Sequence, residues 1–188
     1  MYSKISILLL FVIIVSCQPV ELISPLELDN SKLEKISINA KDVNIQVKYN
    51  PIFSEENIED QLINTPVKIL KSWINSNIIN YGNQNYLLIN VYDSSILKKE
   101  IENKNSKKYE EKTIFQYEVF FLVEYELYDN SDYLLASTTV EVSRSTTSQK
   151  YVSLNETEII INDLIIKALK DFIDETQSMT KLYMSEYL

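Results

Sequence analysis

The chain has 188 residues, enough for one domain, and 45% of them are hydrophobic, too many for a disordered protein. It contains no histidine, one cysteine and one glycine, which excludes histidine-based catalysis, imidazole metal sites, disulfides and glycine-rich phosphate loops. With 27 acidic against 18 basic residues, it is a poor candidate for binding nucleic acid. We therefore expect no catalytic residue, no metal and no cofactor.

The N-terminus carries the pattern of an export signal. Lys4 precedes an apolar run over residues 5–15, and the small residue Ser16 comes directly before Cys17. The run is shorter than the roughly 20 apolar residues that span a bilayer. Residues 14–17, Ile-Val-Ser-Cys, resemble a bacterial lipobox, in which the cysteine is acylated, with palmitate among its acyl groups, and becomes the first residue of the mature protein.

Acylation of Cys17 makes residues 1–16 a lipoprotein signal peptide and 17–31 a lipidated tether, and leaves 32–188 as a single periplasmic α+β domain. One acyl chain anchors a protein weakly, so stable attachment takes two or more. Gln18 follows the cysteine, and in the lipoproteins that the chain resembles a residue other than aspartate favours export to the outer membrane. We expect the periplasmic face of the outer membrane, with the inner membrane as the alternative. An ordinary signal peptide with an incidental cysteine is the other interpretation.

The domain is predicted to begin with a strand and a long loop. Residues 33–49 alternate apolar and polar side chains around a polar break, and Pro51 ends the strand region. Residues 50–64 form an acidic loop that contains Phe53 and Ile58. A loop of this length in a compact domain is either functional or simply mobile.

A helix is predicted over residues 65–82. Thr65 is an N-cap candidate, Pro66 suits the first helical position, and Gly82 supplies a stop. Trp73 lies beside the apolar stripe, where a core residue is more common than a ligand-stacking one. The stripe consists of Val67, Leu70, Ile74, Ile78 and Tyr81.

Residues 86–96 are predicted to form the next strand, and residues 98–112 a charged hairpin extension or loop. Asp93 near the strand end is more typical of a carboxylate bonded to backbone amides than of a catalytic acid. A contact between the lysines of the charged segment and lipid headgroups is the alternative to simple solvation.

Two long strands with a turn at 129–132 form a predicted hairpin. Residues 114–128 alternate, with one face for the core and a second face that mixes acids with Phe120 and Leu122. Residues 133–147 return as the partner strand. Arg144 near its end is expected to pair with an acid such as Glu118, and binding of a ligand anion is the alternative. The core face of the first strand consists of Tyr117, Val119, Phe121, Val123, Tyr125 and Leu127; that of the second consists of Leu134, Ala136, Thr138, Val140 and Val142.

A capping box, Ser153-Leu154-Asn155-Glu156, opens a last helix that runs nearly to the C-terminus. Two amphipathic helices each need a partner for their apolar stripe, and packing both on one sheet face is the simplest solution. The predicted fold is α+β: an antiparallel sheet of about four strands with two helices on one face, in the order β-α-β-β-β-α.

These landmarks resemble an uncharacterised family of alphaproteobacterial lipoproteins over most of the mature chain. The lipobox and the architecture also resemble, more loosely, the auxiliary lipoproteins of ABC-type lipid transport systems. The matching motifs are Tyr49-Asn50-Pro51, Asn57-Ile58-Glu59, Pro66-Val67 before Trp73, Asp93-Ser94-Ser95-Ile96, Ser143-Arg144-Ser145, and the finish from Leu182 to Tyr187-Leu188.

The sequence predicts a non-enzymatic envelope lipoprotein that acts as a binding or auxiliary module, with lipid transport as its most specific version. A structural or assembly lipoprotein and a carboxylate hydrolase that uses acids such as Asp93 and Glu118 are the alternatives. The expected partners are the membrane through the lipid anchor, an envelope protein and a lipid ligand, and not nucleic acid. Besides Cys17, the expected contact residues are Phe53, Ile58, Phe120 and Leu122.

Overall fold

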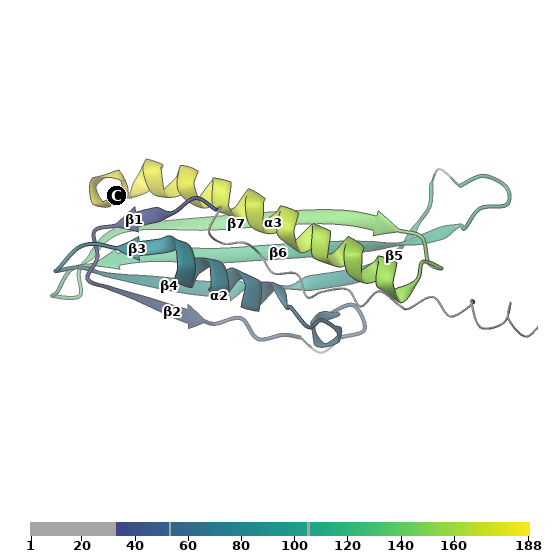
Figure 1. Cartoon of the computed structure of the whole chain (residues 1–188), viewed down its shortest axis with the longest axis horizontal. Coiled ribbons are helices and arrows are strands. Elements are labelled where there is room, and N and C mark those ends of the chain that lie inside the picture. The colour runs from purple at the N-terminus through teal and green to yellow at the C-terminus, as the bar shows by residue number, and fades with distance from the viewer. Residues whose placement is uncertain (1–32, 53, 105) are drawn as a thin grey trace, which may run out of the picture.

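The computed structural model describes residues 33–52, 54–104 and 106–188. Cys17, with the predicted signal peptide and tether, lies outside the described residues, and so does Phe53. Two helices, α2 (Pro66–Asn77) and α3 (Leu154–Tyr183), lie on the same face of a sheet of long strands (Figure 1). This is the α+β architecture with both helices on one face that the sequence predicts.

The main sheet is built around its longest strand, β6 (Thr113–Tyr128). β7 (Leu134–Ser148) pairs along one edge of β6, and β4 (Tyr86–Asp93) and β5 (Ile96–Glu102) follow each other along the other edge. β2 (Asp42–Val47) pairs with β4 on the outside. A second, two-stranded sheet joins β1 (Ile36–Ile38) to β3 (Ile78–Asn80).

The prediction of a purely antiparallel sheet is wrong at two places. β2 runs parallel to β4, and β1 runs parallel to β3. The cause is the connection between β2 and β4, which contains α2 and returns the chain to the end of the sheet where β2 began. The sheet is therefore mixed, and the predicted order of elements omits β3 and the division of the first strand region into β1 and β2.

β4 and β5 form one nearly continuous strand along β6. Asp93 is paired with Leu122 and Ile96 with Val119, in the same register, after an irregularity between Val91 and Asp93. The strand predicted over 86–96 therefore extends to Glu102 and includes the first part of the charged segment. Only residues 103–112 connect β5 to β6.

The first helix is shorter than predicted. α2 ends at Asn77, and the next three residues form β3 because they pair with β1. Gly82 is therefore not a helix stop. A Cβ on Gly82 would lie 2.7 Å from the backbone nitrogen of Ala40, so the glycine allows two backbone segments to approach closely. Pro66 occupies the start of α2 as predicted, but the side chain of Thr65 makes no capping hydrogen bond.

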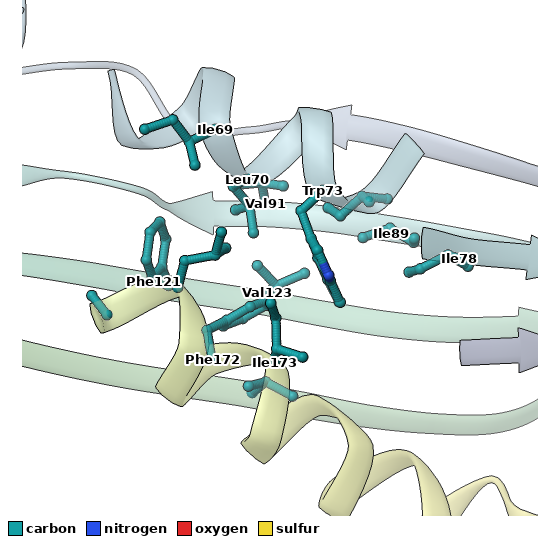
Figure 2. Packing of buried hydrophobic residues seen from close by; sticks show 14 of the residues in the cluster. Ile69, Leu70, Trp73, Ile78, Ile89, Val91, Phe121, Val123, Phe172 and Ile173 are labelled. Atoms are coloured by element: carbon teal, nitrogen blue, oxygen red, sulfur yellow. The ribbon is translucent and has the colours of Figure 1, made fainter. Parts of the chain in front are cut away.

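The core lies between the helices and the sheet. Trp73 of α2 is fully buried and meets Phe172 of α3 edge-on, with 5.9 Å between ring centroids. Phe172 also packs on Phe121 of β6, with 5.5 Å between the ring centroids (Figure 2). All six residues predicted for the core face of β6 are buried, which confirms the strand's alternation.

Among the predictions for β7 and α3, the one for Leu134 is wrong. Leu134 is exposed because an irregularity in the pairing near Tyr128 displaces it from the core face. Arg144 pairs with an acid as predicted, but the acid is Asp171 of α3 and not the suggested Glu118, because the Arg144 side chain lies on the helix side of the sheet. The Ser153 cap is confirmed: its Oγ accepts a hydrogen bond from the backbone nitrogen of Glu156 at 3.1 Å.

Candidate functional site

A cleft of about 690 Å³ lies between the segment that follows β2 and the first turn of α2. Pro51, Ile52 and Val67 give it an apolar wall. The side chain of Ile52 is 75% exposed, so its apolar surface is open to a binding partner. We call this cavity the loop cleft.

Three carboxylates, Glu55, Glu59 and Asp60, stand against this apolar wall. Ser54, Asn57 and Thr65 complete the described lining, so no lysine or arginine contributes to it within the described residues. Glu55 and Asp60 are exposed, whereas Glu59 is buried. The electrostatic character of the loop cleft is therefore negative.

The edge of β5 holds the outer side of the loop cleft in place. β2 ends before it can cover β5, and residues 56–58 take that position instead. The backbone nitrogen of Lys98 donates to the carbonyl of Glu56 at 2.7 Å, and that of Ile58 donates to the carbonyl of Ile96 at 3.3 Å. An isolated bridge joins Asn57 to Leu97. The cleft is therefore built on backbone pairing as well as on side chains.

A part-buried polar cluster of Tyr49, Asn57 and Glu59 contributes to the loop cleft through Asn57 and Glu59. The hydroxyl of Tyr49 donates a hydrogen bond to Glu59 Oε1, and Asn57 Nδ2 donates a longer one to the same oxygen at 3.4 Å. The backbone nitrogen of Glu59 in turn donates to Asn57 Oδ1 at 2.9 Å. Burial, followed by the hydrogen bond to Glu59, raises the pKa of Tyr49 well above its ordinary value. Tyr49 therefore stays a neutral donor, and Glu59 is fixed in orientation.

This arrangement suits binding by charge and shape. An apolar wall faced by carboxylates can accept a ligand that combines an aliphatic or aromatic part with a positive charge. In the part of the chain that the structure describes, no group of three or more carboxylate, cysteine or histidine side chains is placed to hold a metal ion. No helix among those residues is long and apolar enough to cross a membrane.

The structure does not bring the predicted contact residues together. Ile58 is 3% exposed and belongs to the core, because the pairing of residues 56–58 with β5 turns it inward. Phe120 and Leu122 are half-buried on the face of the sheet that carries neither helix, where their register partners on β7 are Ser143 and Glu141. Neither lines the loop cleft.

The two acids considered for hydrolysis have different surroundings. Glu118 accepts a hydrogen bond from Ser143 at 3.1 Å on the open face of the sheet. Asp93 Oδ1 is buried and has no hydrogen-bond partner among the described residues, so the bonding to backbone amides that the sequence favours for the Asp93 carboxylate does not occur at this oxygen. Its negative charge adds a smaller contribution to the raised pKa of Tyr49.

The residues that sequence reasoning missed are Ile52 and Val67. The sequence indicates the acidic loop as a candidate surface, but no periodicity within a loop shows which apolar residue points outward. Val67 was assigned to the core stripe of the helix, whereas it is half-buried at the rim of α2. In comparisons with known proteins, no family model and no curated protein matches this chain.

Proposed function

We propose that this protein is a membrane-anchored, non-enzymatic binding module of the bacterial envelope, and that its loop cleft holds a positively charged segment of a partner protein. The observation that carries the proposal is the pairing of an apolar wall with three carboxylates in one cleft, with no basic side chain among its described lining. A lysine or arginine that carries its charge on an aliphatic stem matches both features.

The anchor in this proposal is Cys17, on the strength of the lipobox-like residues 14–17. A tethered protein meets a partner in the same membrane at a high effective concentration, so a modest cleft is sufficient for binding. The phosphate of an anionic lipid would meet charge of its own sign in the loop cleft. We therefore favour a protein segment over a lipid as its occupant, and the role in lipid transport rests on the resemblance alone.

The test is site-specific photo-crosslinking in cells. A photoreactive phenylalanine derivative replaces Ile52 in the cleft wall, and as a matched control it replaces Ile63, which is 70% exposed in the same loop but does not line the cleft. We expect a discrete adduct from position 52 only. Mass spectrometry of that adduct should place the crosslink beside a lysine or arginine of the partner.

The charge requirement is tested in the same cells. Glu55→Gln with Asp60→Asn removes two exposed carboxylates and keeps the shape of the cleft, so the adduct at position 52 should fall several-fold. Equal adducts from positions 52 and 63, or an adduct that is indifferent to the two neutral substitutions, would show that the loop cleft is not the binding site.

A further inference from the structure

We propose that the β5–β6 hairpin end contacts the anionic phospholipid headgroups of the membrane in which the protein is anchored. The surface consists of Lys104, Lys107, Lys108, Tyr109 and Lys112, which we call the lysine tip. The proposal rests on the lipid anchor of the proposed function but not on the loop cleft.

The lysine tip lies at one extreme of the molecule. The connection between β5 and β6 projects beyond the body of the sheet, at the end away from the C-terminus (Figure 1). Internal hydrogen bonds shape it: the backbone nitrogen of Asn103 donates to the carbonyl of Lys112 at 2.8 Å, and Lys112 Nζ donates to the carbonyl of Lys107 at 3.1 Å. A projecting, shaped hairpin end can reach a surface before the rest of the domain does.

The charge of this end is opposite to that of the remaining chain. Residues 98–112 contain six lysines and four glutamates, whereas all other residues contain 12 basic and 23 acidic side chains. Within the described residues, the side chains of Lys104, Lys107 and Lys108 form no ion pair. An anionic surface therefore attracts the lysine tip and repels the rest of the domain, so the charge distribution favours one orientation.

Tyr109 adds an interfacial side chain to these charges. It is 92% exposed, and the ammonium of Lys108 lies 5.6 Å from its ring centroid. Tyrosine is favoured at the membrane–water interface because its ring is apolar and its hydroxyl is polar. Lysines around an exposed tyrosine are therefore a combination that suits the headgroup region.

The tether makes a weak contact effective. Each lysine near an anionic bilayer strengthens binding by about fivefold. With three or four lysines, this is too little to hold an unanchored protein on the membrane. Residues 17–32 can span roughly 55 Å when fully extended, so an anchored domain stays close enough for its hairpin to touch the bilayer repeatedly. The contact then sets orientation more than it sets attachment.

The test places an environment-sensitive fluorophore on a cysteine introduced by Tyr109→Cys in the acylated protein, whose own Cys17 is blocked by its lipid. The matched position is Tyr133→Cys, 72% exposed in the β6–β7 turn. The protein is reconstituted in vesicles of phosphatidylethanolamine with phosphatidylglycerol, or of phosphatidylcholine alone. At position 109, and not at position 133, we expect the fluorophore emission to shift to the blue and to be quenched by nitroxide lipids. This response should occur only in the anionic vesicles, and high salt should reverse it.

The lysines are tested by Lys104→Gln, Lys107→Gln and Lys108→Gln together, which should abolish the signal at position 109. The triple variant Lys71→Gln, Lys170→Gln and Lys181→Gln removes the same charge from exposed helical positions and should keep it. A water-like emission at position 109 in anionic vesicles, or an equal response in phosphatidylcholine, would overturn the proposal.

The anchor is tested separately, by measuring whether the acylated protein floats with the vesicles in a density gradient. If the acylated protein does not float, the proposed anchor is wrong, and the hairpin is tested on a chain held to nickel-chelating lipid by a hexahistidine tag at position 17. The chain has no histidine of its own, so the tag is the sole attachment. The same fluorescence outcomes then support or overturn the contact of the lysine tip.

Discussion

Trp73 shows how one side chain joins the layers of this protein. Its ring lies between α2, the edge of Phe172 on α3 and the sheet beneath, and it is fully buried (Figure 2). The sequence predicted this burial from the position of Trp73 beside an apolar helical stripe. Because both helices and the sheet lose contacts when the ring is removed, this position should be among the most sensitive to truncation.

Trp73→Ala should lower the free energy of unfolding by about 3–5 kcal/mol, the range for large aromatic truncations in cores. Urea unfolding followed by circular dichroism measures the change, with Tyr109→Ala as the exposed aromatic control. Before mutation, the native emission of the single tryptophan should be blue-shifted and poorly quenched. Red, water-like emission from the folded protein would place Trp73 at the surface and return it to the list of candidate ligand contacts.

Tyr125 is predicted to make the stability of the fold sensitive to alkaline pH. Burial raises its pKa well above the ordinary value near 10, and the neighbouring Thr176 offsets only part of the rise. Below pH 10 the tyrosine is neutral in both the folded and the unfolded state, and its contribution to the free energy of unfolding is fully present. As the pH rises above 10, the unfolded chain ionises first, so the contribution is lost progressively toward the raised folded pKa.

The measurement is the free energy of unfolding between pH 8 and pH 12 for the natural chain and for Tyr125→Phe. Lysines and the other tyrosines titrate in both proteins, so the difference between the two curves isolates Tyr125. The natural chain should lose stability more steeply above pH 10. Parallel curves would mean that Tyr125 ionises as easily in the folded state as in the unfolded state.

At the scale of elements, the sequence predicted best where one period repeats over many residues. The sequence places β6 and α3 almost to their ends. Apolar residues alternate through the 16 residues of β6 and recur at helical spacing through the 30 residues of α3, so a few exceptions do not hide the pattern. The sequence places β1 inside one longer strand region and misses β3, because three residues carry no period and each of these strands depends on the other for its hydrogen bonds. β2 runs parallel to β4 because the chain crosses over through α2 between them. This direction depends on how the elements are connected, so the residue pattern of β2 alone does not show it.

The start of α3 offers a direct test of an element. Ser153→Ala removes the acceptor for the backbone nitrogen of Glu156 and should lower the free energy of unfolding by about 1 kcal/mol. Ser153→Asp keeps an acceptor and should retain most of the stability. Thermal unfolding of the three proteins distinguishes them. If the alanine and aspartate variants are equally destabilised, the capping hydrogen bond is not what makes this position matter.

At the scale of the whole molecule, the candidate site could be predicted as a segment but not as a surface. The long acidic loop was identified from its length and composition, yet the pairing of residues 56–58 with β5 turns Ile58 into the core and leaves Ile52 outside. That pairing is tertiary, so the loop sequence alone does not contain it. The opposed charges of the lysine tip and the remaining chain, by contrast, can be read from the sequence, and the fold adds where the tip projects.

Both the binding module and the orienting hairpin act at a membrane, so both proposed roles depend on the acylation of Cys17. The direct measurement is palmitate labelling and membrane fractionation of cells that express the natural chain or Cys17→Ala. We predict that the natural chain is labelled and sediments with membranes, and that the alanine variant is unlabelled and leaves the membrane fraction. A Cys17→Ala variant that still takes up palmitate and still sediments with membranes would show that Cys17 is not the anchor.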